Sequence, residues 1–95
     1  MQISKDQIVR SLLKKGFKEE ECKHHRQFFH VVDGRETGIK TFISHSPGIK
    51  VYGDELLAKM KGQLKLHSKK DFIDLLNCPL SAEGYIAKLQ ENGEI

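Results

Sequence analysis

The chain has 95 residues, of which 38% are hydrophobic and 31% charged, and its formal net charge is +3. This size predicts one small domain, and the composition argues against a disordered or membrane-embedded chain. The excess of basic over acidic residues is too small to indicate nucleic-acid binding unless the basic residues cluster. The charged N-terminal segment predicts no secretion signal, so we expect a cytoplasmic protein in which Cys22 and Cys78 are reduced thiols.

The first predicted helix covers residues 5–15. Ser4 and Gln7 have the spacing of a capping box at its start, and Gly16 is placed to end it. Its expected apolar stripe has helical spacing and consists of Ile8, Val9, Leu12 and Leu13.

Three strands are predicted next. Residues 17–22 are a weak candidate for an edge strand, residues 23–32 are rich in aromatic and β-branched side chains, and residues 38–45 alternate apolar with polar. The Asp33-Gly34 pair predicts a turn inside a loop that reaches Gly38. The last two strands are therefore expected to pair as a hairpin.

Three further helices follow the break at Pro47. Asp54 is the expected cap of a helix over residues 54–66, whose stripe would be Leu56, Leu57, Met60 and Leu64. Ser68 and Ser81 open two shorter helices on either side of Pro79. The order α-β-β-β-α with two added helices predicts an α+β fold, in which helices cover one face of a three-stranded antiparallel sheet.

The second predicted strand holds the run KHHRQFFHV. Because side chains alternate along a strand, it divides into two faces. One face carries His24, Arg26, Phe28 and His30, and the other carries His25, Gln27, Phe29 and Val31. We expect the face of Phe29 and Val31 to point toward the core.

These histidines have three interpretations. They are ordinary strand residues, or ligands of a metal together with Cys22 and His45, or groups that act on a phosphate. The spacing matches no zinc template, so no metal and no cofactor is predicted. Histidine can transfer a proton near neutral pH, and a lysine or arginine beside it can hold a phosphate, which is sufficient in principle for RNA cleavage.

The ordered motifs LLKKGF, HHRQFFH, DGR and TFISHSPG, followed by a lysine-bearing helix, resemble the HicA toxins of bacterial and archaeal toxin–antitoxin pairs. The resemblance covers roughly residues 4–66. It implies a double-stranded-RNA-binding-domain-like fold, with a HicA-like domain at residues 1–66. Residues 67–95 are then a C-terminal helical extension that packs on the same domain.

The resemblance also implies a function, that of a metal-independent mRNA endonuclease held inactive by a HicB-like antitoxin. His25 falls at the position of the catalytic histidine, and His24 is the next candidate. The residues expected to contact RNA are Arg26, Lys40, Lys50, Lys59 and Lys61. The Gly-Ser that precedes the family's histidine is absent here, so the alternative is a non-catalytic module that binds RNA or a partner protein. No membrane association is expected.

Overall fold

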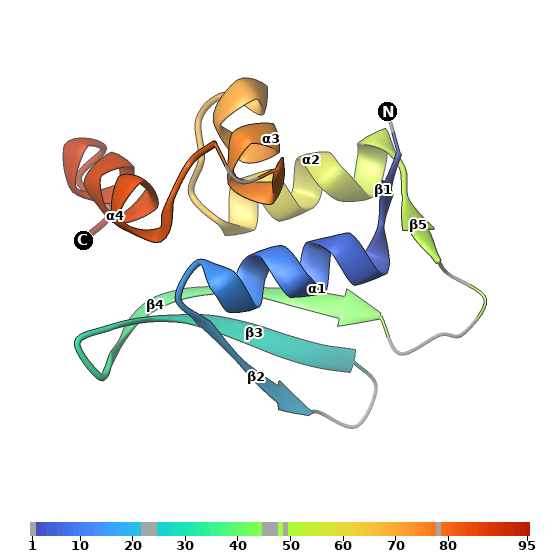
Figure 1. Ribbon diagram of the computed structural model, residues 1–95, viewed down its shortest axis with the longest axis horizontal. Helices are drawn as coiled ribbons and strands as arrows, with labels where there is room; N and C mark the ends of the chain where they lie inside the picture. The colour runs from blue at the N-terminus through green and yellow to red at the C-terminus, as the bar shows by residue number, and fades with distance from the viewer. Residues whose placement is uncertain (1, 22–24, 45–47, 49, 78) are drawn as a thin grey trace.

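The computed structural model describes residues 2–21, 25–44, 48, 50–77 and 79–95 (Figure 1). In this part of the chain five strands and four helices are present. Their bounds, in chain order, are β1 Ile3–Ser4, α1 Lys5–Lys14, β2 Phe17–Glu21, β3 His25–Val32, β4 Arg35–Ser44, β5 Val51–Tyr52, α2 Asp54–Gln63, α3 Lys69–Asn77 and α4 Ala82–Glu91.

The main sheet has three antiparallel strands in the order β2-β3-β4, and a separate two-stranded ladder joins β1 to β5. The helices lie on one side of the main sheet, with α1 nearest to it and α3 farther out (Figure 1). The predicted α+β architecture, a three-stranded antiparallel sheet with helices on one face, is therefore confirmed. We call the side of the sheet that carries the helices its helical face and the other side its open face. No helix in the described part of the chain is long and apolar enough to cross a bilayer.

Helix α1 begins as predicted, because the Ser4 hydroxyl accepts a hydrogen bond from the backbone N–H of Gln7 at 3.1 Å. The reciprocal half of the capping box is not formed. The Gln7 side chain instead donates to Asn77 Oδ1 at 2.7 Å, at the end of α3. Leu12 is fully buried, but Leu13, which was expected in the same stripe, is exposed.

The β3–β4 hairpin turns more tightly than predicted. Asp33 and Gly34 both have positive φ, of 52° and 79°, which is the backbone of a two-residue hairpin turn. Strand β4 consequently begins at Arg35, and the predicted loop to Gly38 is wrong. Gly38 has φ of +88° beside an irregularity in the pairing opposite His30, so its glycine signal marks a bulge inside the strand.

The predicted core face of β3 is also wrong. Phe28 and His30 are buried, whereas Phe29 is half-buried and points to the open face. The pairing explains this result, because Phe28 lies opposite Thr41 on β4 and shares the helical face with it. Phe28 and Phe29 are adjacent, so each face of β3 carries one phenylalanine, and hydropathy alone does not indicate which face is buried.

Helix α2 covers the helical face beside β4. The N-cap of this helix is Gly53, and no side chain makes a capping hydrogen bond there. Asp54, which was predicted as the cap, is instead the first helical residue. Leu57 and Met60 are buried as expected, but Leu56 is 44% exposed. The helix is joined to the sheet by a polar contact, in which the hydroxyl of buried Thr41 donates to Gln63 Oε1 at 2.5 Å.

The C-terminal helices α3 and α4 are capped by Ser68 and Ser81, the two serines predicted to open them. Each serine hydroxyl accepts a backbone N–H three residues ahead. Both helices contribute to the same hydrophobic core as the rest of the chain, through Phe72, Leu75, Leu76, Tyr85 and Leu89.

Tyr85 connects the extension to the sheet. Its ring centroid lies 5.8 Å from that of Phe17 and 5.0 Å from that of His30, and its hydroxyl donates to the Leu64 carbonyl at 2.8 Å. Burial raises the pKa of this phenol, which keeps the hydroxyl protonated as a donor.

Replacing Tyr85 is therefore expected to destabilise the whole domain. Tyr85→Ala should lower the free energy of unfolding by about 3–5 kcal/mol, and Tyr85→Phe by about 1 kcal/mol through loss of the bond to Leu64. Urea denaturation followed by circular dichroism measures both, with Gln90→Ala on the exposed side of α4 as the control. A Tyr85→Ala protein whose β3 amides keep full protection from hydrogen exchange would contradict this expectation.

Candidate functional site

The histidines that the structure describes occupy three different environments. His25 lies on the open face of β3, His30 lies in the core, and His67 is exposed before α3, with its Nε2 3.9 Å from Glu94. His24, Cys22 and His45 lie outside the described residues. Among the residues that are described, no group of three His, Cys, Asp or Glu side chains could hold a metal ion.

His25 is half-buried, and its imidazole meets the edge of an aromatic ring. The Phe42 ring centroid is 4.7 Å away, and the two planes are inclined by 85°. In the β3–β4 ladder, Phe42 lies opposite Gln27, so the two rings share the open face. A T-shaped contact of this kind restricts the orientation of the imidazole ring.

Arg26 projects from the helical face, opposite to His25. Its Nε and a terminal nitrogen donate to the two carboxylate oxygens of Glu19 on β2, at 2.6 and 2.8 Å. The guanidinium also lies 5.6 Å from the ring centroid of Phe28. The hydrogen bond to Glu19 raises the pKa of Arg26. This bidentate pair commits the arginine to β2 and separates it from His25.

The four lysines expected to contact RNA are spread over the molecule. Lys40 is exposed on the open face, opposite Phe29 in the β3–β4 ladder, and is the one that shares a face with His25. Lys50 is exposed just before β5, where its carbonyl accepts the backbone N–H of Lys5 at 2.8 Å. The other two, Lys59 and Lys61, lie on α2.

A hollow of about 120 Å³ lies between β4 and α2, and we call it the β4–α2 groove. It is lined by Phe42, Tyr52, Leu56, Lys59, Met60 and Gln63. Phe42 belongs both to this groove and to the contact with His25, so the two features adjoin. The groove was not predicted from the sequence. The available signal was Phe42, an aromatic residue on the face of the predicted strand that otherwise carries the polar residues Lys40 and Ser44.

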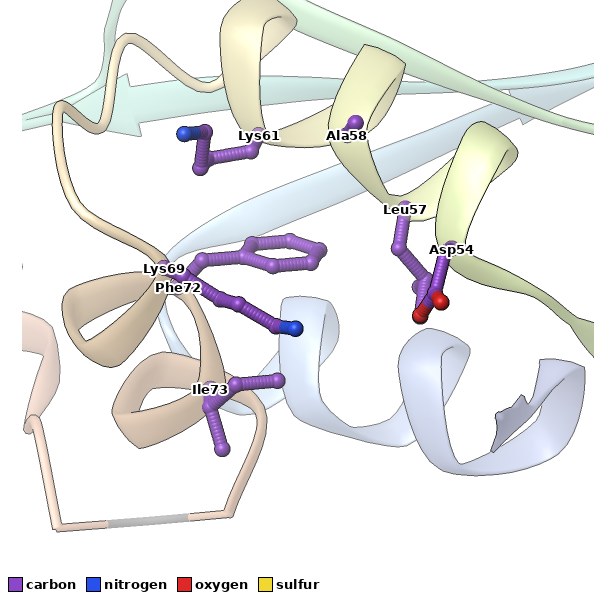
Figure 2. A pocket seen from close by; sticks show the side chains of 7 residues that line it. All are labelled: Asp54, Leu57, Ala58, Lys61, Lys69, Phe72 and Ile73. Carbon is purple, nitrogen blue, oxygen red and sulfur yellow. The ribbon is translucent and has the colours of Figure 1, made fainter. Parts of the chain in front are cut away.

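Lys61 belongs to a different hollow, of about 280 Å³, between α2 and α3. Figure 2 shows Lys69 extending across the apolar floor of this hollow toward Asp54, while the Lys61 ammonium points away from both. The facing Lys69 and Asp54 leave little net charge there. Because this hollow lies among the helices, it is separated from the open face that carries His25.

His30 is a core residue. It is 1% exposed, its Nδ1 lies 3.2 Å from the Thr37 hydroxyl, and its ring sits 5.0 Å from both Phe17 and Tyr85. Its Nε2 is buried without a hydrogen-bond partner in the described part of the chain. Burial lowers the pKa of this imidazole, so the neutral form is favoured.

Comparison with protein-family models, with curated proteins and with solved structures found no match for this chain.

The buried imidazole of His30 predicts an acid-sensitive fold. The unfolded chain takes up a proton at this residue below about pH 6.5, while the folded protein, whose pKa is lower, does not. Stability is thus lost as the pH falls through this range, by at most about 1.4 kcal/mol per pH unit from this group.

His30→Leu should flatten the dependence of the unfolding free energy on pH between about pH 7 and about pH 5. Urea denaturation at several pH values measures it, and Gln90→Ala, which changes no titratable group, should keep the wild-type dependence. An unchanged slope in His30→Leu would mean that the folded protein protonates this ring as readily as the unfolded chain does.

Proposed function

We propose that this chain is a HicA-type endoribonuclease with a double-stranded-RNA-binding-domain-like fold, and that it cleaves mRNA without a metal. The order α1-β2-β3-β4-α2, with the helices on one face of the sheet, agrees with such a fold. The ordered motifs of the sequence supply the reason for choosing this family.

The position of His25 is the observation that carries the proposal. Of the histidines that the structure describes, it is the one on the open face of the sheet, where no helix covers it. It is the same residue that the motif spacing places at the catalytic position. His30 lies on the opposite, helical face, where Phe17 and Tyr85 enclose its ring.

The reaction that suits such a site is attack by a ribose 2′-hydroxyl on the adjacent phosphate. His25 takes the proton of the 2′-hydroxyl, the 2′ oxygen bonds to phosphorus, and the bond from phosphorus to the 5′ oxygen breaks. The leaving 5′ oxygen takes a proton from water, and the protonated His25 returns its proton to the solvent, so the step balances. The products are a 2′,3′-cyclic phosphate and a 5′-hydroxyl, and a nearby cation stabilises the charge that develops on phosphorus.

Lys40 and Lys59 are the candidate cations for the RNA backbone on this side of the molecule. Lys40 is on the same face as His25, and Lys59 lines the groove that shares Phe42 with it. Lys50 and Lys61 would contribute at a distance, as part of the electrostatic attraction for RNA. Arg26, paired with Glu19 on the helical face, would hold β2 against β3 near the histidine.

A HicB-like antitoxin is the expected protein partner, and it would act by covering the open face. The alternative function, a non-catalytic module that binds RNA or such a partner, uses the same surface without proton transfer. Cleavage therefore separates the two functions more sharply than binding does.

His25→Ala should lower the rate of RNA cleavage in EDTA by about 100-fold or more, because a general acid–base group contributes on this scale. The assay follows a 5′-labelled single-stranded RNA and identifies the cyclic phosphate on the product. His67→Gln is the matched control, since His67 is exposed and lies away from the sheet.

A second variant, His24→Ala, decides between the two adjacent candidates. If it abolishes cleavage while His25→Ala does not, the catalytic role belongs to His24. Intact RNA with wild-type protein, together with salt-sensitive RNA binding, would overturn the endonuclease and favour the binding module.

A further inference from the structure

We propose that the β4–α2 groove binds one unpaired RNA base next to the phosphate on which His25 acts. This inference rests on the proposed function and adds to it a subsite that selects the base. Such a subsite requires a single-stranded RNA substrate, because a base can enter the groove only when it is unpaired and unstacked.

Phe42 links the groove to His25, because it contacts the His25 ring and is also one of the residues that line the groove. A nucleotide whose phosphate lies at His25 therefore has a neighbouring base within reach of the groove. The hollow between α2 and α3, by contrast, shares no residue with the surroundings of His25.

The lining of the groove combines apolar and polar side chains. Met60 and Tyr52 are buried and form an apolar floor, while Leu56 is 44% exposed and stands as a wall. An exposed leucine beside an apolar floor offers a surface on which the flat face of a base can lie. Every base has such a face, so this part of the groove attracts bases without choosing among them.

Gln63 gives the groove a hydrogen-bond donor in a fixed position. The buried Thr41 hydroxyl donates to Gln63 Oε1, which sets the orientation of the amide. Gln63 Nε2 makes no hydrogen bond within the described residues and belongs to a side chain that lines the groove. This N–H group can therefore donate to an acceptor on the edge of a base, and contacts of that kind discriminate among bases.

Lys59 completes the subsite with a charge. It is exposed on α2 and lines the groove, so its ammonium can meet the phosphate that follows the bound base. A phosphate contact strengthens binding to all sequences equally, whereas a base contact does not. The groove therefore contains separate groups for affinity and for selectivity.

The test compares four single-stranded RNAs that differ only in the base beside the cleavage site. We expect kcat/KM of the wild-type protein to differ among them, and Gln63→Leu to reduce the spread by about tenfold. Gln90→Leu, an exposed glutamine on α4, is the matched control.

Two further variants assign the roles. Thr41→Val removes the bond that positions Gln63 and should also reduce the spread among bases, which a loss of stability alone would not do. Lys59→Gln should lower kcat/KM for all four RNAs alike and weaken its dependence on salt. Lys14→Gln, on the exposed side of α1, should do neither.

A direct measurement does not depend on cleavage. A 4-thiouridine placed beside the cleavage site of an RNA bound to His25→Ala should photo-crosslink to residues of the groove, identified by mass spectrometry. If wild-type protein cleaves RNA but Gln63→Leu keeps the full base preference, or the crosslink falls elsewhere, the groove is not the base subsite and the endonuclease stands. If wild-type protein cleaves no RNA, the proposed function fails, and a crosslink outside the groove would overturn the subsite as well.

Discussion

The pairing register of β3 with β4 is the constraint on which the rest of the structure depends. Side chains alternate along a strand, so a shift of one residue would exchange the two faces of β3. The register near His25 is fixed by the two-residue turn at Asp33-Gly34, by the bulge at Gly38 and by the burial of Phe28 opposite Thr41. His25 reaches the open face only because Phe28, three residues later, is in the core.

The same register explains the distribution of charge around the site. It sends Arg26 to the helical face, where a charge at the edge of the core requires a partner, and Glu19 on β2 provides one in a bidentate pair. A guanidinium held in this way has little capacity left for a phosphate. The candidate cations for RNA are therefore lysines on exposed positions, Lys40 on the sheet and Lys59 on α2.

Three helix caps could be predicted from the sequence, although the cap at Asp54 and the length of the Asp33-Gly34 turn could not, and features set by distant contacts could not either. The caps at Ser4, Ser68 and Ser81 depend on a residue three positions away, so each was predicted and each is present. The burial of His30 depends on Tyr85, which lies in another helix far along the chain. The β4–α2 groove likewise depends on how a helix meets a strand, and hydropathy along either element does not encode that geometry.

The C-terminal helices leave the open face and the β4–α2 groove as the surfaces suited to a large ligand. Tyr85 covers Phe17 and His30 on the helical face. The side chains of Ser11 on α1 and of Lys15, the C-cap of that helix, donate to the carbonyls of Leu76 and Leu80. These contacts occupy the side of α1 that faces the extension. Phe29 and Phe42 meanwhile remain half-buried on the open face, which has no helix to cover it. These partly exposed aromatic side chains beside His25 are the surface on which the RNA of the proposed function would stack.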